Sequence, residues 1–216
     1  MKGILIRDVL ILYKKYLKIT TYVVLTLGIL ATIIFGFSIN SLLSLILPAG
    51  IGTLATNLFV EDEKDNWLRF IKTLPISSEK IVLARFLVFN GLVILSTLYI
   101  LSLNVLSYLI HEDQKLIYYI IFSICGFAFS IFNNFLLMPA CYKFGIKGAN
   151  NVSIIILIVL GLFSVSIQKI NFWYFINIYK SIPHYIILVM VVLIYIIMGF
   201  ISIKLSTHLY NNKDKV

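Results

Sequence analysis

Few residues of this sequence have the side chains and the spacing that catalysis or metal binding requires. The three histidines, His111, His184 and His208, lie outside the long apolar runs or at their ends. No HExxH motif occurs, and no Ser, His and Asp can be placed together as a catalytic triad. No GxxxxGK[ST] phosphate-binding loop occurs either. We therefore predict no catalytic, cofactor-binding or metal-binding residues, and we expect that this chain is not an enzyme.

A distinctive pattern of another kind lies between residues 61 and 80. It opens with the charged run EDEKD at 61–65, and Pro75 stands ten residues further on. Between them, large apolar residues recur at i, i+3, i+4 and i+7: Trp67, Phe70, Ile71 and Leu74. This spacing predicts a short helix with one apolar stripe, ended by the proline. Two interpretations are open, because such a stripe suits either a membrane surface or a groove in a soluble partner.

The composition indicates the medium in which these segments lie. Hydrophobic residues make up 61% of the 216 residues, only 12% are charged, and the mean hydropathy is +1.01. A chain so poor in charge cannot cover a water-facing surface, so we predict an integral membrane protein. The net charge of +9 does not indicate a nucleic-acid partner, because the basic residues stand between long apolar runs, as topology-setting charges do.

Uncharged runs predict six membrane-spanning helices. The run from Ile19 to Val60 has 42 residues, twice the ~20 that one crossing needs, and we expect the polar triplet 38–40 to divide it. Each later run is long enough for one helix. A helix is expected because it hydrogen-bonds its backbone N–H and C=O groups within one segment, as the lipid interior requires. The expected spans are about 19–37, 41–60, 81–110, 116–141, 149–168 and 184–204. The predicted fold is thus all-α, with a six-helix transmembrane domain over 19–204 and a tail at 205–216.

The distribution of lysine and arginine predicts the orientation. Fifteen of the 18 basic residues fall on the side that holds both termini and the 61–85 loop, and three fall on the other side. Basic loops remain in the cytoplasm, so we expect a multi-pass protein of the bacterial cell membrane with both termini cytoplasmic. On the outer side, the aromatic-rich segment around 168–184 suits an interfacial belt, and a re-entrant lid is the alternative.

Residues 1–18 are predicted to form an amphipathic interfacial helix. At 100° per residue, Arg7, Lys14 and Lys18 fall close together on one face, and Lys15 adjoins them. Such a helix would lie at the inner membrane surface with its lysines toward the lipid headgroups. The alternative is a basic flank with no further role.

No charged residue lies in the middle of an expected span, and the polar residues there are amides and hydroxyls. Ion-coupled carriers and charged-ring channels usually need an ionisable residue within the membrane, so both are disfavoured. The amides in question are Asn90, Asn104, Asn133 and Asn134. They suit hydrogen bonds between helices or the lining of a translocation path, and the sequence does not separate the two.

Three segments carry a resemblance to a known family. The chain opens with a basic stretch containing the pair Arg7-Asp8 (MKGILIRDVLILYKK). Residues 61–86 contain DEK at 62–64, LPIS at 74–77 and an Ile-Val pair before Arg85, and residues 138–150 read MPACYKFGIKGAN. These segments, together with a matching order of the spans, make the chain resemble a short six-span permease of the type-2 ABC exporter superfamily. It departs from the family at 148–150, where Ala or Gly followed by Arg is usual.

The resemblance implies a partner set and a division of labour. The permease would pair with a second copy or a paralogue and with two cytoplasmic ABC ATPase subunits, which would hold the ATP and Mg²⁺. Residues 1–18 would be an elbow helix, and the helix after span two would be a coupling helix on the ATPase. The expected ATPase contacts are Trp67, Phe70, Ile71, Leu74 and Pro75 in a groove, with Asp62 and Glu63 at its rim.

Relatives in this superfamily export phenol-soluble modulins and antimicrobial peptides, so the resemblance implies ATP-driven export of amphipathic or hydrophobic peptides. Two other functions remain as alternatives. One is an ATP-independent immunity or scaffold protein that binds a peptide in the membrane. The other is a small secondary carrier, for which intramembrane ionisable residues and inverted repeats are expected; the sequence shows neither.

Overall fold

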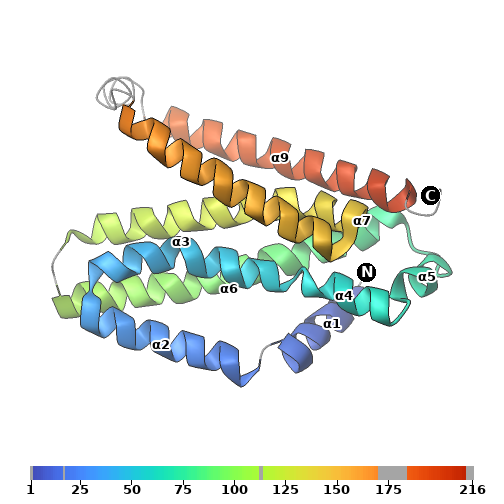
Figure 1. Cartoon of the computed structure of the whole chain (residues 1–216), viewed down its shortest axis with the longest axis horizontal. Helices are drawn as coiled ribbons and strands as arrows, with labels where there is room; N and C mark the ends of the chain where they lie inside the picture. The colour runs from blue at the N-terminus through green and yellow to red at the C-terminus, as the bar shows by residue number, and fades with distance from the viewer. Residues whose placement is uncertain (1, 17, 112–113, 170–183, 213–216) are drawn as a thin grey trace. The chain divides into compact units, whose positions relative to one another are not determined.

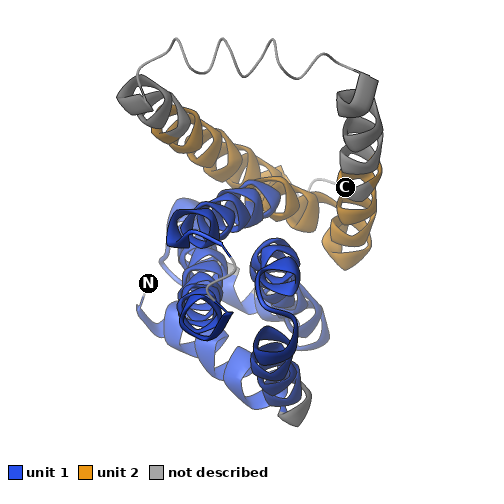
Figure 2. Ribbon diagram, turned by 90° about the vertical axis from the view of Figure 1, so that its left-hand side faces the viewer, with its two compact units in different colours: residues 1–134 blue, residues 135–216 orange. Residues whose placement is uncertain are grey.

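Helices account for all the regular structure in the described residues, which confirms the all-α prediction. The computed structural model describes residues 2–16, 18–111, 114–169 and 184–212 (Figure 1). The chain divides into two units, residues 1–134 and 135–216 (Figure 2).

Among its described residues, the first unit contains seven complete helical elements and the beginning of an eighth. In chain order these are α1 (Lys2–Ile11), a π-helical turn η1 (Leu12–Tyr16), α2 (Ile19–Phe35), α3 (Phe37–Leu54), α4 (Asn57–Lys64), α5 (Trp67–Lys72), α6 (Ser78–His111) and the first part of α7 (Leu116–Lys169).

The break between α2 and α3 falls at Gly36 and not at the polar triplet that the sequence suggested. Gly36 has φ 59° and ψ −139°, a conformation that residues with a Cβ rarely adopt. Asn40, from the triplet, lies inside α3 and is buried, and it accepts a hydrogen bond from the Thr32 hydroxyl at 2.9 Å. The polar residue therefore joins the two helices, and the glycine separates them.

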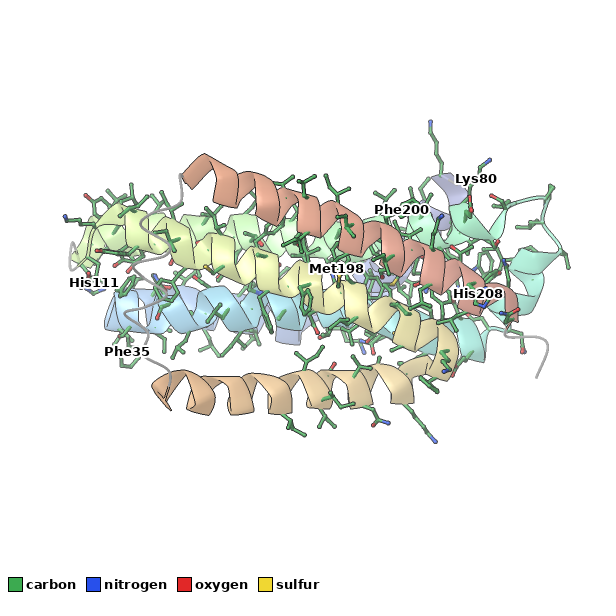
Figure 3. The ribbon with its side chains drawn as sticks, turned by 90° about the horizontal axis from the view of Figure 1, so that it is seen from above. Phe35, Lys80, His111, Met198, Phe200 and His208 are labelled. Atoms are coloured by element: carbon green, nitrogen blue, oxygen red, sulfur yellow. The ribbon has the colours of Figure 1, made fainter. Side chains whose placement is uncertain are left out.

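The long helices of the first unit pack tightly side by side. α3 runs along α6, and α2 contacts both, with Leu47, Ile100 and Leu103 forming a buried cluster between them. Figure 3 shows Phe35 and His111 at one end of these helices and Lys80 at the other. At the first end, the His111 ring Nε2 lies 2.9 Å from the carbonyl oxygen of Ile33.

The described residues supply four helical segments that are long and apolar enough to cross a membrane. They are Phe37–Lys64, Ser78–His111, Leu116–Ile156 and Val192–Asn212. A fifth arises if Lys2–Tyr16 and Thr21–Phe35, which meet at 74°, are taken as one bent span. The six expected spans are therefore not all reproduced. The expected 149–168 span reaches beyond the residues whose side chains are described, and the expected 168–184 lid falls largely outside the described residues.

The second unit is built on the remainder of α7 and on α9 (His184–Asn212). Between the expected spans 116–141 and 149–168, α7 is kinked, and Gly145 there has φ 66° and ψ −156°. The Ser202 hydroxyl of α9 donates to the Phe135 carbonyl oxygen at 2.7 Å, and the Phe135 and Tyr195 rings lie 5.2 Å apart. These contacts hold α9 against the part of α7 that precedes the kink.

Candidate functional site

The candidate site is the segment that links α3 to α6, which contains the predicted apolar stripe. α4 ends at Lys64, and Asn66 reverses the chain with a left-handed conformation (φ 50°). α5 then runs for six residues, from Trp67 to Lys72, and the chain reaches α6 through a turn that includes Pro75. A short helix before the proline is therefore present, as the spacing predicted.

The residues of the stripe do not all face the same way. Ile71 is fully buried, whereas the Phe70 side chain next to it is 54% exposed. Trp67 and Leu74 are half-buried, and Pro75 is exposed. The Trp67 and Phe70 rings are neighbours, with centroids 5.3 Å apart. Ile71 thus anchors α5 to its own chain, and Phe70 is the large apolar residue presented outward among the side chains of this helix that the structure describes.

Four charged residues from three elements form a charge cluster behind α5: Arg7 and Asp8 of α1, Asp62 of α4 and Arg85 of α6. The Asp62 carboxylate accepts from Arg7 Nη1 and from Arg85 Nη2, both at 2.7 Å. Arg85 Nε lies 2.9 Å from Asp8 Oδ2. These contacts fix the N-terminal helix, the end of α4 and the base of α6 to one another.

Two aromatic rings cover the charge cluster. The Arg7 guanidinium carbon lies 3.9 Å from the centroid of the Trp67 ring, and that of Arg85 lies 5.0 Å from the centroid of Phe59. Such cation–π contacts strengthen when they are desolvated. Through Trp67, the charge cluster therefore contacts α5 directly.

Burial places a strong constraint on the charge cluster. The side chains of Asp8, Asp62 and Arg85 are almost completely buried. Burial raises the pKa of Asp8 above its ordinary value, although the positive charges of Arg85 and Arg7 act in the opposite direction. Buried charges are tolerated only when each has partners, so the loss of any one would leave the others uncompensated.

The geometry changes the expected roles of Asp62 and Arg7. Asp62 was expected at the rim of an ATPase contact, but its carboxylate is inside the chain, between two arginines. Arg7 was expected to face lipid headgroups, but it points toward Asp62. The reason is that an opposite charge within the fold is a better partner than solvent for a residue on the packed face. Glu63 is exposed, so the rim role predicted for it remains open.

Of the basic residues expected on one face, Lys14, Lys15 and Lys18 are exposed, and only Arg7 turns inward. The outward face of α1 is apolar. Its exposed large side chains are Ile6, Val9, Leu10 and, just beyond it, Tyr13. Its inward face carries Ile4 and the charged Asp8, and Leu12 packs with Leu58 and Val88. Charge inside and apolar surface outside suit a helix in contact with lipid whose charges are satisfied by its neighbours.

A second group of polar residues surrounds Glu61. Its carboxylate accepts from the Tyr16 hydroxyl at 2.9 Å, from Lys64 Nζ at 3.0 Å and from Lys15 Nζ. The hydrogen bond to Glu61 raises the pKa of Lys15. This group joins η1 to the end of α4, beside the charge cluster.

The predicted membrane amides differ in their surroundings. The Asn104 amide nitrogen donates to Ser123 Oγ at 2.6 Å, to Ser44 Oγ at 3.1 Å and to the Tyr119 carbonyl oxygen at 3.2 Å. These bonds link α3, α6 and α7 and favour a packing role for Asn104. Asn133 is buried and Asn90 is half-buried.

Asn134 is buried, yet its amide makes no hydrogen bond to the described residues. It faces Gly52, where an added Cβ would lie 3.2 Å from the amide oxygen.

The pairing of Asp8 and Arg85 was not predicted from the sequence, although one signal for it is present. Arg85 stands among apolar residues inside α6, and a charge in that position needs a partner.

Within the described residues, no group of three or more His, Cys, Asp or Glu could hold a metal ion.

The chain matches a known protein family. A family model described as ABC-2 family transporter protein matches residues 3–211 of the chain. No curated protein matches, and no solved structure matches. The family match agrees with the resemblance drawn from the sequence, at the level of a type-2 ABC permease.

Proposed function

This chain belongs to the ABC-2 transporter family, and on that basis we propose that it is the permease subunit of an ATP-driven exporter whose α5 docks on the ATPase. Membership makes the chain a multi-pass membrane component of a transporter, and it implies association with ABC ATPase partners. In this proposal the chain itself holds no cofactor. ATP and Mg²⁺ bind to the ATPase subunits.

The observation that carries the docking proposal is the contrast between two adjacent residues of α5. Ile71 is buried in its own chain, while Phe70 is exposed beside a half-buried Trp67. A rigidly anchored aromatic side chain is the typical centre of a protein–protein contact. Within the folded chain, Phe70, Trp67 and the exposed Pro75 are therefore the contacts that we propose for the groove, with Glu63 at its rim.

The charge cluster connects α5 to α1 and α6 through direct contacts. Trp67 covers Arg7, and Arg7 shares Asp62 with Arg85 of α6. A displacement of α5 by the ATPase would therefore act on α1 and on the base of α6 together. In this proposal, ATP binding and hydrolysis move these helices through the cluster.

We further propose an amphipathic or hydrophobic peptide as the substrate, moved along the seam between two permeases. The support is the chemistry of the expected spans, whose middle parts hold amides and hydroxyls but no charged residue. Several of these are already bonded to one another, as Asn104 is to Ser44 and Ser123. An apolar lining suits such a cargo better than an ion. The second permease would be a copy or a paralogue.

Affinity purification in mild detergent tests the docking proposal. We expect a P-loop ATPase from the native host to co-purify with the wild-type permease, and to be recovered poorly with Phe70→Ala. Truncation of an aromatic anchor typically costs ~2 kcal/mol or more of binding free energy. The matched control is Tyr13→Ala, which removes a similarly exposed ring (61%) from outside α5.

Equal recovery of the ATPase with Phe70→Ala and Tyr13→Ala, at matched membrane levels, would reject α5 as the docking element. Absence of any ATPase from the wild-type preparation would favour the peptide-binding immunity or scaffold alternative. A second control, Lys72→Ala, changes a residue of the same helix that lies off the stripe by its position in the sequence.

A further inference from the structure

A basic depression lies where η1 and the end of α4 meet. It has a volume of about 490 Å³, and four lysines line it: Lys14, Lys15, Lys18 and Lys64. The other lining residues are Tyr16, Glu61 and Asp65. Lysine is thus the dominant side chain of this depression, which adjoins the start of the first apolar helix.

The positive charge of the depression is only partly neutralised by the chain. Glu61 accepts hydrogen bonds from Lys15, Lys64 and Tyr16, which takes up its carboxylate oxygens. Within the described residues, neither Lys14 nor Lys18 has an ion-pair partner. A lysine ammonium has three N–H donors, so Lys15 also keeps donors after binding Glu61. An anion placed here would meet the unpaired ammonium groups of Lys14 and Lys18 and the remaining donors of Lys15, with the Asp65 carboxylate also in the lining.

The backbone brings these lysines together by an unusual device. Residues Leu12–Tyr16 form a π-helical turn, and Lys18 follows in an extended conformation with φ −91° and ψ 178°. π-helical turns are rare in proteins, and those that occur are often found at functional sites. Here the turn allows Lys15 and Tyr16 to reach Glu61 while Lys14 and Lys18 line the same depression.

An apolar surface begins directly beside the depression. α2 starts at Ile19, immediately after Lys18. It exposes large apolar side chains along its length, which include Tyr22, Val23, Leu27, Leu30 and Ile34. A ligand with a phosphate at one end and hydrocarbon at the other would satisfy both surfaces, whereas a soluble phosphate would use only the lysines.

We propose that this depression binds the headgroup phosphate of an anionic phospholipid, with the acyl chains lying along α2. Lys14 and Lys18 are the principal phosphate ligands, and Lys15 adds a third donor while it remains bound to Glu61. Basic pockets at the membrane surface recognise anionic lipids in this way. A bound lipid would brace η1 against α4, next to the charge cluster, and this proposal does not depend on the ATPase.

Lipid retention by the purified permease tests the proposal. The permease is placed in nanodiscs made from equal parts of phosphatidylglycerol and phosphatidylcholine, released, and analysed by native mass spectrometry. We expect wild type to retain phosphatidylglycerol selectively. The Lys14→Gln/Lys18→Gln variant should lose that preference roughly tenfold or more, since each lysine near an anionic surface contributes severalfold.

The matched control is Lys143→Gln/Lys147→Gln, which removes the same charge from two exposed lysines elsewhere. It should retain the lipid as wild type does, and Lys14→Arg/Lys18→Arg should restore retention. Equal losses in both glutamine variants would show diffuse attraction and overturn the site, as would undiminished retention in Lys14→Gln/Lys18→Gln. Displacement of the lipid by soluble glycerol 3-phosphate would also overturn it, because the ligand would then be a soluble phosphate.

Discussion

Arg85 and Asp62 form a buried ion pair in which Nη2 of the arginine lies 2.7 Å from Oδ2 of the aspartate. The pair joins the base of α6 to the end of α4, on the segment that leads to α5. Arg7 binds the other oxygen of the same carboxylate. One aspartate therefore connects the N-terminal helix, the proposed docking segment and a membrane helix.

Removal of Arg85 should destabilise the protein strongly. In Arg85→Met, the buried carboxylates of Asp8 and Asp62 lose their shared partner, and breaking a buried pair in this way costs about 3–5 kcal/mol. The free energy of unfolding in detergent measures the effect. The control is Lys64→Gln, because Lys64 is exposed and Glu61 keeps two other donors; this change should cost less than about 1 kcal/mol. Similar losses in both variants would contradict the central role of the charge cluster.

Gly126→Ala should disturb the packing of α7 on α3. An added Cβ would lie 1.8 Å from the carbonyl oxygen of Ser44, which is backbone and cannot swing aside. Overpacking of this kind typically costs 1–3 kcal/mol or more. Gly91→Ala is the control, because nothing lies within 4 Å of its added Cβ. We expect a lower melting temperature for Gly126→Ala alone; an unchanged melting temperature would contradict the close approach of Gly126 to the Ser44 backbone.

Asn104→Ala should weaken the fold and leave the specific transport rate nearly unchanged. The substitution removes hydrogen bonds to Ser44, Ser123 and the Tyr119 carbonyl. Interhelical hydrogen bonds in membranes contribute about 0.6 kcal/mol on average and up to about 1.7 kcal/mol. Unfolding in detergent and transport per folded permease are to be compared with those of Asn90→Ala. A large loss of transport with normal stability would instead place Asn104 in the translocation path.

Ile71→Ala and Phe70→Ala should separate stability from binding. Ile71 is fully buried, so its truncation should cost about 2–5 kcal/mol of folding free energy. Phe70 is exposed, so its truncation should leave the melting temperature of the isolated permease close to that of wild type. Thermal unfolding of both variants in one detergent provides the comparison, and an equal fall in melting temperature would show that Phe70 is also part of the core.

Cysteine labelling should place the α4–α5 segment inside the cell. In a background with Cys125 and Cys141 replaced, a membrane-impermeant maleimide should label Lys115→Cys in intact cells. It should label Glu63→Cys only after permeabilisation, since the excess of basic residues favours a cytoplasmic position for this segment. Both positions are exposed, so access to the side chain is not limiting. The reverse labelling pattern would invert the proposed orientation.

The positions of the helix breaks show which helix boundaries the local sequence pattern predicted correctly and which it did not. The spacing of Trp67, Phe70 and Ile71 predicted a helix before Pro75, and α5 is found there. The division of the long uncharged run was expected at the polar triplet 38–40 and occurs at Gly36. Polarity was the wrong guide, because Asn40 could be satisfied by Thr32 inside the fold, whereas the reversal of the chain needed a residue without a Cβ.

The sequence by itself determined the helical membrane architecture, the short helix with its stripe, and the resemblance to type-2 ABC permeases. These follow from composition, period and motif, which are local properties of the chain. Only the tertiary structure decided that Ile71 points inward and Phe70 outward, and that Arg7 meets Asp62 rather than a headgroup. A helical period gives the angle of a side chain about its own axis. It does not give the neighbour at that angle, because Arg7 and Asp62 are 55 residues apart and meet only when α1, α4 and α6 pack together.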